Sequence, residues 1–168
     1  PASAEAMRFI RDVAGKMPVD KPMRWLSPSG FPVVQHYSQE DSTRINLNAL
    51  GTQLVMRTFN DHLMQRSKVV NGSSPNFKHS LDSAHLEIVV DTFEHSVLPI
   101  HDSFATHACN VDELHCVLRD TFATMYQHHN PLQSLVDCVQ PHVEETITLP
   151  AMGTLDLNKV RESQFFMC

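Results

Sequence analysis

The stretch Val97-Leu98-Pro99-Ile100-His101-Asp102-Ser103-Phe104-Ala105-Thr106 places one carboxylate between two short apolar runs. The first run is typical of a buried strand and the second of its return, so the stretch predicts a tight antiparallel hairpin with Asp102 at its bend. A carboxylate there is costly unless a cation or hydrogen bonds satisfy it. Turn aspartates are common and mostly structural, so the hairpin alone does not indicate a functional site.

Two further stretches of the sequence strengthen the case for a functional site. From Asn76 to His95 the pattern predicts one long helix, on which His79, Asp82 and Ser83 share a face at i, i+3 and i+4. A neutral imidazole both donates and accepts hydrogen bonds, which suits a ribose hydroxyl or the minor-groove edge of a hybrid. The simpler interpretation is a capping cluster at the start of the helix. Downstream, the chain closes on the apolar tail Phe165-Phe166-Met167-Cys168.

The remaining pattern predicts a mixed chain in which an antiparallel sheet is backed by helices. Helices are expected over 2–17, 111–128, 131–139 and 156–162, and strands over 23–26, 31–37, 44–50 and 53–58. The Asn-Gly-Ser-Ser-Pro stretch at 71–75 predicts a loop. The segment 60–68 fits neither a helix nor a strand clearly.

Composition limits the classes of function. The 168 residues suffice for one compact core, and the net charge of −6, with 13 basic against 19 acidic residues, opposes strong nucleic-acid binding by the chain alone. That charge fits a catalytic piece whose basic clefts lie elsewhere, or a protein with no nucleic-acid role. No apolar run approaches a membrane span, so no membrane partner is expected. The four cysteines show no paired spacing and predict reduced thiols.

The helix start at Pro75–His85, the Asp102 hairpin and the Phe-rich tail, in that order, resemble the C-terminal part of the single-subunit RNA polymerases of bacteriophages, mitochondria and chloroplasts. The similarity extends from Trp25 to Cys168. It implies an α+β, partial polymerase fold: an antiparallel palm-type sheet with a catalytic hairpin, backed by helices. Residues 1–168 are then a single unit, the C-terminal palm portion of a larger polymerase. The N-terminal domain, the first metal aspartate and the fingers helix of that family have no counterpart in the sequence.

This resemblance also implies a chemistry: templated ribonucleotidyl transfer by a two-metal mechanism, with the isolated fragment inactive. Asp102 is then the catalytic residue and a ligand of Mg²⁺, and the chain supplies only half of the two-metal site. Residues that bind substrate or nucleic acid are expected at His79, Asp82, Ser83, His101 and Ser103. By strand alternation, His101 should point to the face opposite Asp102. The tail residues Phe165, Phe166 and Cys168 are expected near the site.

The expected partners are the DNA template, the RNA product, ribonucleoside triphosphates and the remainder of the polymerase chain. The implied location is the cytoplasm of a phage-infected bacterium, or alternatively the mitochondrial matrix or a plastid. Two other hypotheses stay open. One is a non-catalytic structural fragment or accessory module that retains the fold. The other is a His/Asp metallohydrolase, suggested only by the 11 histidines. Separately, a structural zinc site could use His107, Cys109, His115 and Cys116, although these residues lack the usual spacing of zinc ligands.

Overall fold

The computed structural model describes residues 2–47, 51–163 and 165–166 of the chain. In chain order, the elements are α1 (Ala2–Lys16), β1 (Met23–Leu26), β2 (Pro32–Gln35), β3 (Ser38–Leu47), β4 (Thr52–Met64), α2 (Arg66–Thr92), β5 (Val97–Ile100), β6 (Ser103–Thr106), η2 (Ala108–Asn110), α3 (Val111–His128), α4 (Pro131–Val139), η3 (Gln140–His142) and α5 (Asn158–Glu162). Helices and antiparallel strands together confirm the expected α+β class. The part of the expected strand at 48–50 lies outside the described residues.

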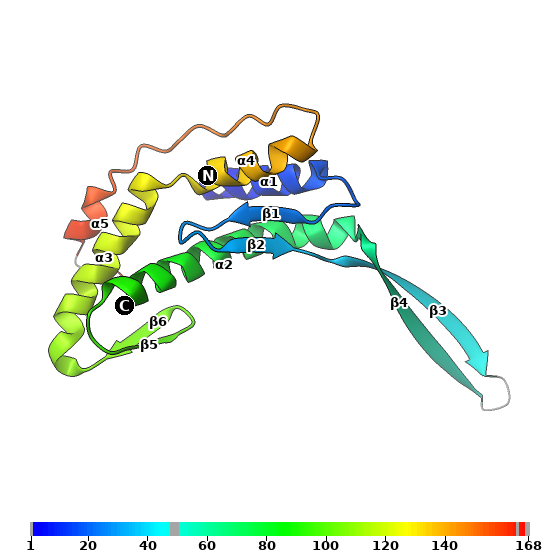
Figure 1. Ribbon diagram of the computed structural model, residues 1–168, viewed down its shortest axis with the longest axis horizontal. Coiled ribbons are helices and arrows are strands. Elements are labelled where there is room, and N and C mark those ends of the chain that lie inside the picture. The colour runs from blue at the N-terminus through cyan, green and yellow to red at the C-terminus, as the bar shows by residue number, and fades with distance from the viewer. Residues whose placement is uncertain (1, 48–50, 164, 167–168) are drawn as a thin grey trace.

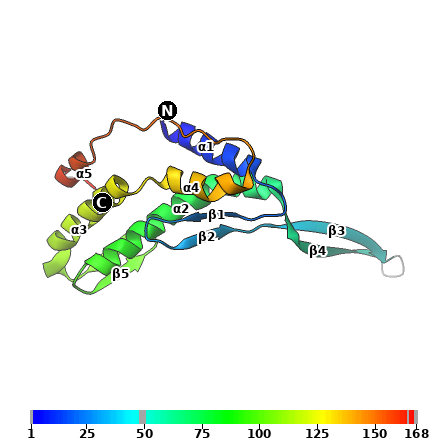
Figure 2. The ribbon, with the colours of Figure 1, turned by 45° about the horizontal axis from the view of Figure 1, so that its top comes forward.

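The long helix α2 runs through the middle of the molecule (Figure 1). Its first half carries the β1–β2 hairpin and packs against α1, while α4 packs against β1. Its second half contacts α3 and β5, and α5 lies against α3 (Figures 1 and 2). The order of these contacts places the two stretches that the sequence singles out, the start of the predicted helix and the Asp102 hairpin, along one helix.

Trp25 is central to the larger of two hydrophobic cores, which forms between α1, β1, the first half of α2 and α4. Its side chain is 2% exposed. The indole N–H donates to Ser80 Oγ at 2.9 Å, and the ring centroid lies 5.7 Å from that of Phe77. Because the large ring is buried and its polar atom is satisfied, Trp25 fixes β1 against α2.

The prediction of a loop at 71–75 is wrong. Helix α2 already begins at Arg66 and runs through this stretch, with Pro75 inside the helix. Buried contacts override the local turn signals. Gln35 donates to the Val69 carbonyl at 2.7 Å. A Cβ atom on Gly72 would lie 2.9 Å from the Tyr37 hydroxyl, so this glycine permits a close approach of α2 to the end of β2 instead of a turn.

A second, smaller core joins the end of α2 to α3 and to the β5–β6 hairpin. Its buried members are Val89, Phe93, Leu114 and Leu118. Four partly buried side chains pack around them: Val97, Phe104, Val117 and Phe166. Because the hairpin strands contribute to this core, the hairpin is held as a fixed projection of the α2–α3 pair.

The strands form three separate two-stranded antiparallel sheets, β1–β2, β3–β4 and β5–β6, instead of the one sheet that the sequence suggests. The β3–β4 ribbon extends away from the body of the molecule (Figures 1 and 2). Most of its side chains are exposed, and Glu40 forms ion pairs with Arg57 at 3.3 Å and with Lys68 at 3.4 Å. Among the described residues, no helix is long and apolar enough to cross a membrane.

Candidate functional site

Asp102 lies in the turn of the β5–β6 hairpin, as the sequence predicts. Ile100 pairs with Ser103, so the bend consists of His101 and Asp102. His101 has a φ of 56°, in the left-handed region that costs a residue with a side chain conformational strain. The expectation that His101 follows strand alternation is therefore wrong, because His101 belongs to the turn and not to the strand.

The hairpin is less buried than its apolar sequence predicts. Leu98 and Ile100 are 59% and 57% exposed, and the Asp102 side chain is exposed as well. The desolvation cost foreseen for this carboxylate is consequently small. An exposed carboxylate at the end of a fixed hairpin keeps its oxygens accessible, which is the property that a metal ligand requires.

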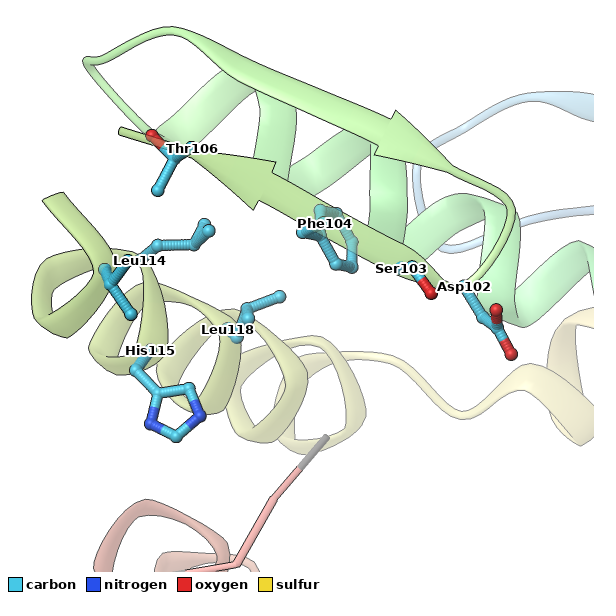
Figure 3. Close-up of a pocket in the computed structure, with 8 residues that line it drawn as sticks. Asp102, Ser103, Phe104, Thr106, Leu114, His115 and Leu118 are labelled. Atoms are coloured by element: carbon cyan, nitrogen blue, oxygen red, sulfur yellow. The ribbon is translucent and has the colours of Figure 1, made fainter. Parts of the chain in front are cut away.

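An open pocket of about 570 Å³ lies between the hairpin and α3. Its lining residues are Asp102, Ser103, Phe104, Thr106, Val111, Leu114, His115 and Leu118. Asp102 and Ser103 lie at one end of the pocket and His115 at the other (Figure 3). Apolar side chains of β6 and α3 form the wall between them. The pocket thus has a hard oxygen ligand at one end and the apolar side chains of Phe104 and Leu118 beside it.

A second pocket, of about 350 Å³, lies between the β1–β2 hairpin and α2. Both His79 and Ser83 line it, together with Phe31 and Glu87. Its polar side chains include a hydroxyl, an imidazole and a carboxylate, which can donate to and accept from a sugar or a base edge. The pocket therefore brings together two of the three residues, His79 and Ser83, that the sequence places on one face of this helix.

Asp82 is expected from the sequence to act together with His79 and Ser83, but it is not among the residues that line this second pocket. It lies near enough to His85 and Tyr126 for its charge to act on both. Burial lowers the pKa of His85, opposed by the hydrogen bond to Leu118 and by the Asp82 charge. Burial, with Asp82 as the second cause, raises the pKa of Tyr126.

The tail turns back onto α3. Phe166 packs against the smaller core, and its ring centroid lies 5.2 Å from that of Phe122 in an edge-on contact. Phe165 is 81% exposed, and Cys168 lies outside the described residues. The structure therefore brings one of the three tail residues to the core that carries Phe104 and Leu118, both of which line the Asp102 pocket.

A metal cluster of protein ligands is absent from the described part of the chain: no three His, Cys, Asp or Glu side chains there are grouped as a metal site. The four candidate zinc ligands, His107, Cys109, His115 and Cys116, are thus not gathered. Asp102 remains as a single carboxylate. One protein carboxylate is sufficient for a Mg²⁺ ion when waters and substrate phosphates complete its coordination shell.

The motifs of the sequence predict no function for the β3–β4 ribbon. Its distal part, residues 42–58, contains Arg44 and Arg57 and no acidic residue, although the chain as a whole is acidic. This local charge contrast is a signal that could have drawn attention to it. A two-stranded antiparallel ribbon also has the dimensions to enter the major groove of DNA.

The known proteins to which this chain is similar are RNA polymerases. The family model described as DNA-dependent RNA polymerase matches residues 3–149. A DNA-directed RNA polymerase of Pseudomonas phage phiKMV is 33% identical over 172 aligned positions, which cover 100% of this chain and 21% of the phage protein. The RNA polymerase of Escherichia phage T7 is 34% identical, over 85% of this chain and 18% of the relative.

Organellar polymerases are equally similar. A chloroplastic/mitochondrial DNA-directed RNA polymerase of Arabidopsis thaliana is 34% identical over 86% of this chain and 14% of its own length. The chain therefore spans about a fifth or less of the length of the curated relatives that it matches.

Proposed function

The chain belongs to the DNA-dependent RNA polymerase family, and we propose that it is the C-terminal palm portion of a single-subunit polymerase that transcribes DNA. The full-length protein carries out templated ribonucleotidyl transfer, and the isolated chain is inactive. One observation carries this proposal: the exposed Asp102 carboxylate at a strained turn, on a hairpin that the α2–α3 core holds beside an open pocket.

Asp102 fits one protein ligand of a Mg²⁺ site. It offers hard, solvent-accessible oxygens on a fixed backbone, and no group of three His, Cys, Asp or Glu side chains among the described residues forms a rival metal site. Divalent ions, when bound, stabilise the charge that develops on the transferring phosphoryl group. Asp102 supplies half of the ligand set on this proposal, and an aspartate from the remainder of the polymerase supplies the other half.

Substrate and nucleic acid lie along α2 and the hairpin in this account. His79 and Ser83 face a common pocket and present donors and acceptors to the ribose of the incoming nucleotide or to the hybrid. His101 and Ser103 flank Asp102 and orient the primer end. Asp82 acts at longer range, through its charge on the groups between α2 and α3.

The β3–β4 ribbon is a contact for the DNA template. Arg44 and Arg57 give its distal part a positive charge, and its width suits the major groove. Arg57 also pairs with Glu40 at 3.3 Å, so binding to phosphate replaces one exposed ion pair by another. Replacing both arginines by glutamine should weaken template binding and reduce its salt dependence.

The other partners are the RNA product, ribonucleoside triphosphates and the rest of the polymerase chain. Similarity extends to polymerases named for phages, mitochondria and chloroplasts. We place the enzyme in the cytoplasm of a phage-infected bacterium, with the mitochondrial matrix or a plastid as the alternative.

A second candidate function is that of a structural fragment or accessory module that retains the fold without catalysis. The single carboxylate at the hairpin favours this alternative for the chain taken alone. Templated incorporation of ribonucleotides by the full-length protein, and not by the 168-residue chain, separates the two. No incorporation by the full-length protein would refute the polymerase proposal, and incorporation by the 168-residue chain alone would refute the half-site.

A further inference from the structure

The short helix α5 is attached to α3 through one guanidinium group. Arg161 Nε donates to Asp120 Oδ1 at 2.7 Å, and Nη1 donates to Asn158 Oδ1 at 2.7 Å. Nη2 donates to Thr124 Oγ1 at 3.0 Å and to Gln127 Oε1 at 3.2 Å. The three α3 acceptors fall at i, i+4 and i+7, so they form one row along the helix.

This attachment stands out because the chain before it has little structure. Residues 143–157 form neither helix nor strand, and they pass over the molecule as an extended segment from η3 to α5 (Figure 1). Ile147 is the one described residue of this segment that is buried. The position of α5 therefore depends mainly on what α5 itself binds.

Directly after α5, the tail makes its aromatic contact. Phe166 packs on Phe122, which lies on α3 between Asp120 and Thr124, two acceptors of the Arg161 guanidinium. Phe122 is also one helical turn beyond Leu118, which lines the Asp102 pocket. The polar and the aromatic attachment thus share one stretch of α3.

We propose that Arg161 is the positioning residue of the C-terminal tail: its guanidinium fixes α5 on α3, and α5 in turn places Phe166 against the core that supports the Asp102 hairpin. Its fork of donors matches four side-chain oxygens at once, which an ammonium group cannot do. The effect on catalysis rests on the proposed polymerase function, whereas the docking of the tail does not.

Fluorine NMR of the full-length polymerase, with 4-trifluoromethyl-phenylalanine incorporated at position 166, tests the docking. The same probe at position 165 gives the reference for a ring in solvent, because Phe165 is 81% exposed. Arg161→Met keeps an unbranched apolar stem about as long as that of arginine up to Nε and removes every donor. Lys159→Met is the matched control, since it removes an exposed basic residue from the same helix.

In Arg161→Met, the position-166 resonance should move at least halfway toward the position-165 reference, and in Lys159→Met it should stay in place. Arg161→Lys, which keeps the charge but not the fork, should move it partway. Asp120→Asn, an isosteric change on the α3 side, should move it in the same direction. A resonance that stays in place in both Arg161→Met and Asp120→Asn would overturn the anchor.

Kinetics of the same variants test the positioning role. Arg161→Met should lower kcat several-fold while KM for ribonucleoside triphosphates and the melting temperature stay near those of the parent enzyme. A displaced tail with an unchanged kcat would overturn the positioning role. Absence of transcription by the parent enzyme would count against the polymerase proposal alone, because the NMR measurement needs no activity.

Discussion

The Nε2 atom of His85 lies 3.1 Å from the Thr121 hydroxyl oxygen, inside the contact between α2 and α3. The same nitrogen lies 3.1 Å from the Leu118 carbonyl. Thr121 already donates to the Val117 carbonyl at 2.7 Å, so its oxygen accepts from His85 and the imidazole is protonated on Nε2. One buried histidine thus connects the helix that bears His79 to the helix that supports the Asp102 hairpin.

We predict that this contact makes the stability of the chain sensitive to acid. Burial lowers the pKa of His85 in the folded state, so below the ordinary histidine pKa the unfolded chain binds a proton that the folded chain resists. Stability should therefore fall as the pH drops from about 6.5 through the lower folded-state pKa. Urea unfolding at about pH 7.5 and about pH 5.5 measures the loss.

The His85→Gln variant should lose part of this dependence, because its amide keeps a donor but takes up no proton. The exposed His36 offers the matched control, since His36→Gln should leave the slope near that of the parent chain. Equal slopes in the parent chain and in His85→Gln would assign the acid sensitivity to other groups.

His79→Ala should weaken the use of ribonucleotides by the full-length polymerase. Loss of one sugar or hybrid contact should cost about 1–3 kcal/mol, and the preference over deoxyribonucleotides should decrease. His79→Gln, which retains a donor and an acceptor, should recover part of the loss. Steady-state kcat/KM for both kinds of nucleotide measures the effect, and an unchanged ratio in His79→Ala would return His79 to the role of an exposed helix residue.

The sequence predicts best where local pattern and packing agree. The expected helix over 111–128 matches α3, and the turn at Asp102 lies where the apolar runs place it. The sequence-based prediction fails at 71–75, where contacts from Gln35 and Tyr37, which no local window contains, override the turn signals of Asn71, Gly72 and Pro75. Two further features depend on how α3 packs, which the spacing along one helix does not determine. Asp82 acts on groups between α2 and α3 instead of lining the His79 pocket, and Arg161 binds side chains of α3.

Two glycines test the corrected assignment of 71–75. Gly15→Ala on α1 meets no atom within 4 Å, so it should stabilise the chain by up to about 1 kcal/mol through helix propensity. Gly72→Ala should instead destabilise it by about 1–3 kcal/mol, because the new methyl group meets the Tyr37 hydroxyl. Free energies of unfolding in urea compare the two. A stabilising Gly72→Ala would mean that α2 does not approach Tyr37 this closely.

Deleting residues 165–168 from the full-length enzyme should reduce transcription more than thermal stability. The reason is that Phe166 packs against the core that contains Leu114 and Leu118, and both of these residues line the Asp102 pocket. Rates of run-off transcription and melting temperatures of the two proteins measure the difference. A shortened polymerase with normal turnover would show that the tail has no part in catalysis.

The most direct test of the account is run-off transcription by the full-length polymerase carrying Asp102→Asn. The amide keeps the shape of the side chain and removes the charge that binds a divalent ion, so the rate should fall about 1,000-fold or more. The melting temperature should match that of the parent. Asp12→Asn, at an exposed position on α1, should transcribe normally. A near-normal transcription rate in Asp102→Asn would contradict the assignment of Asp102 as a metal ligand.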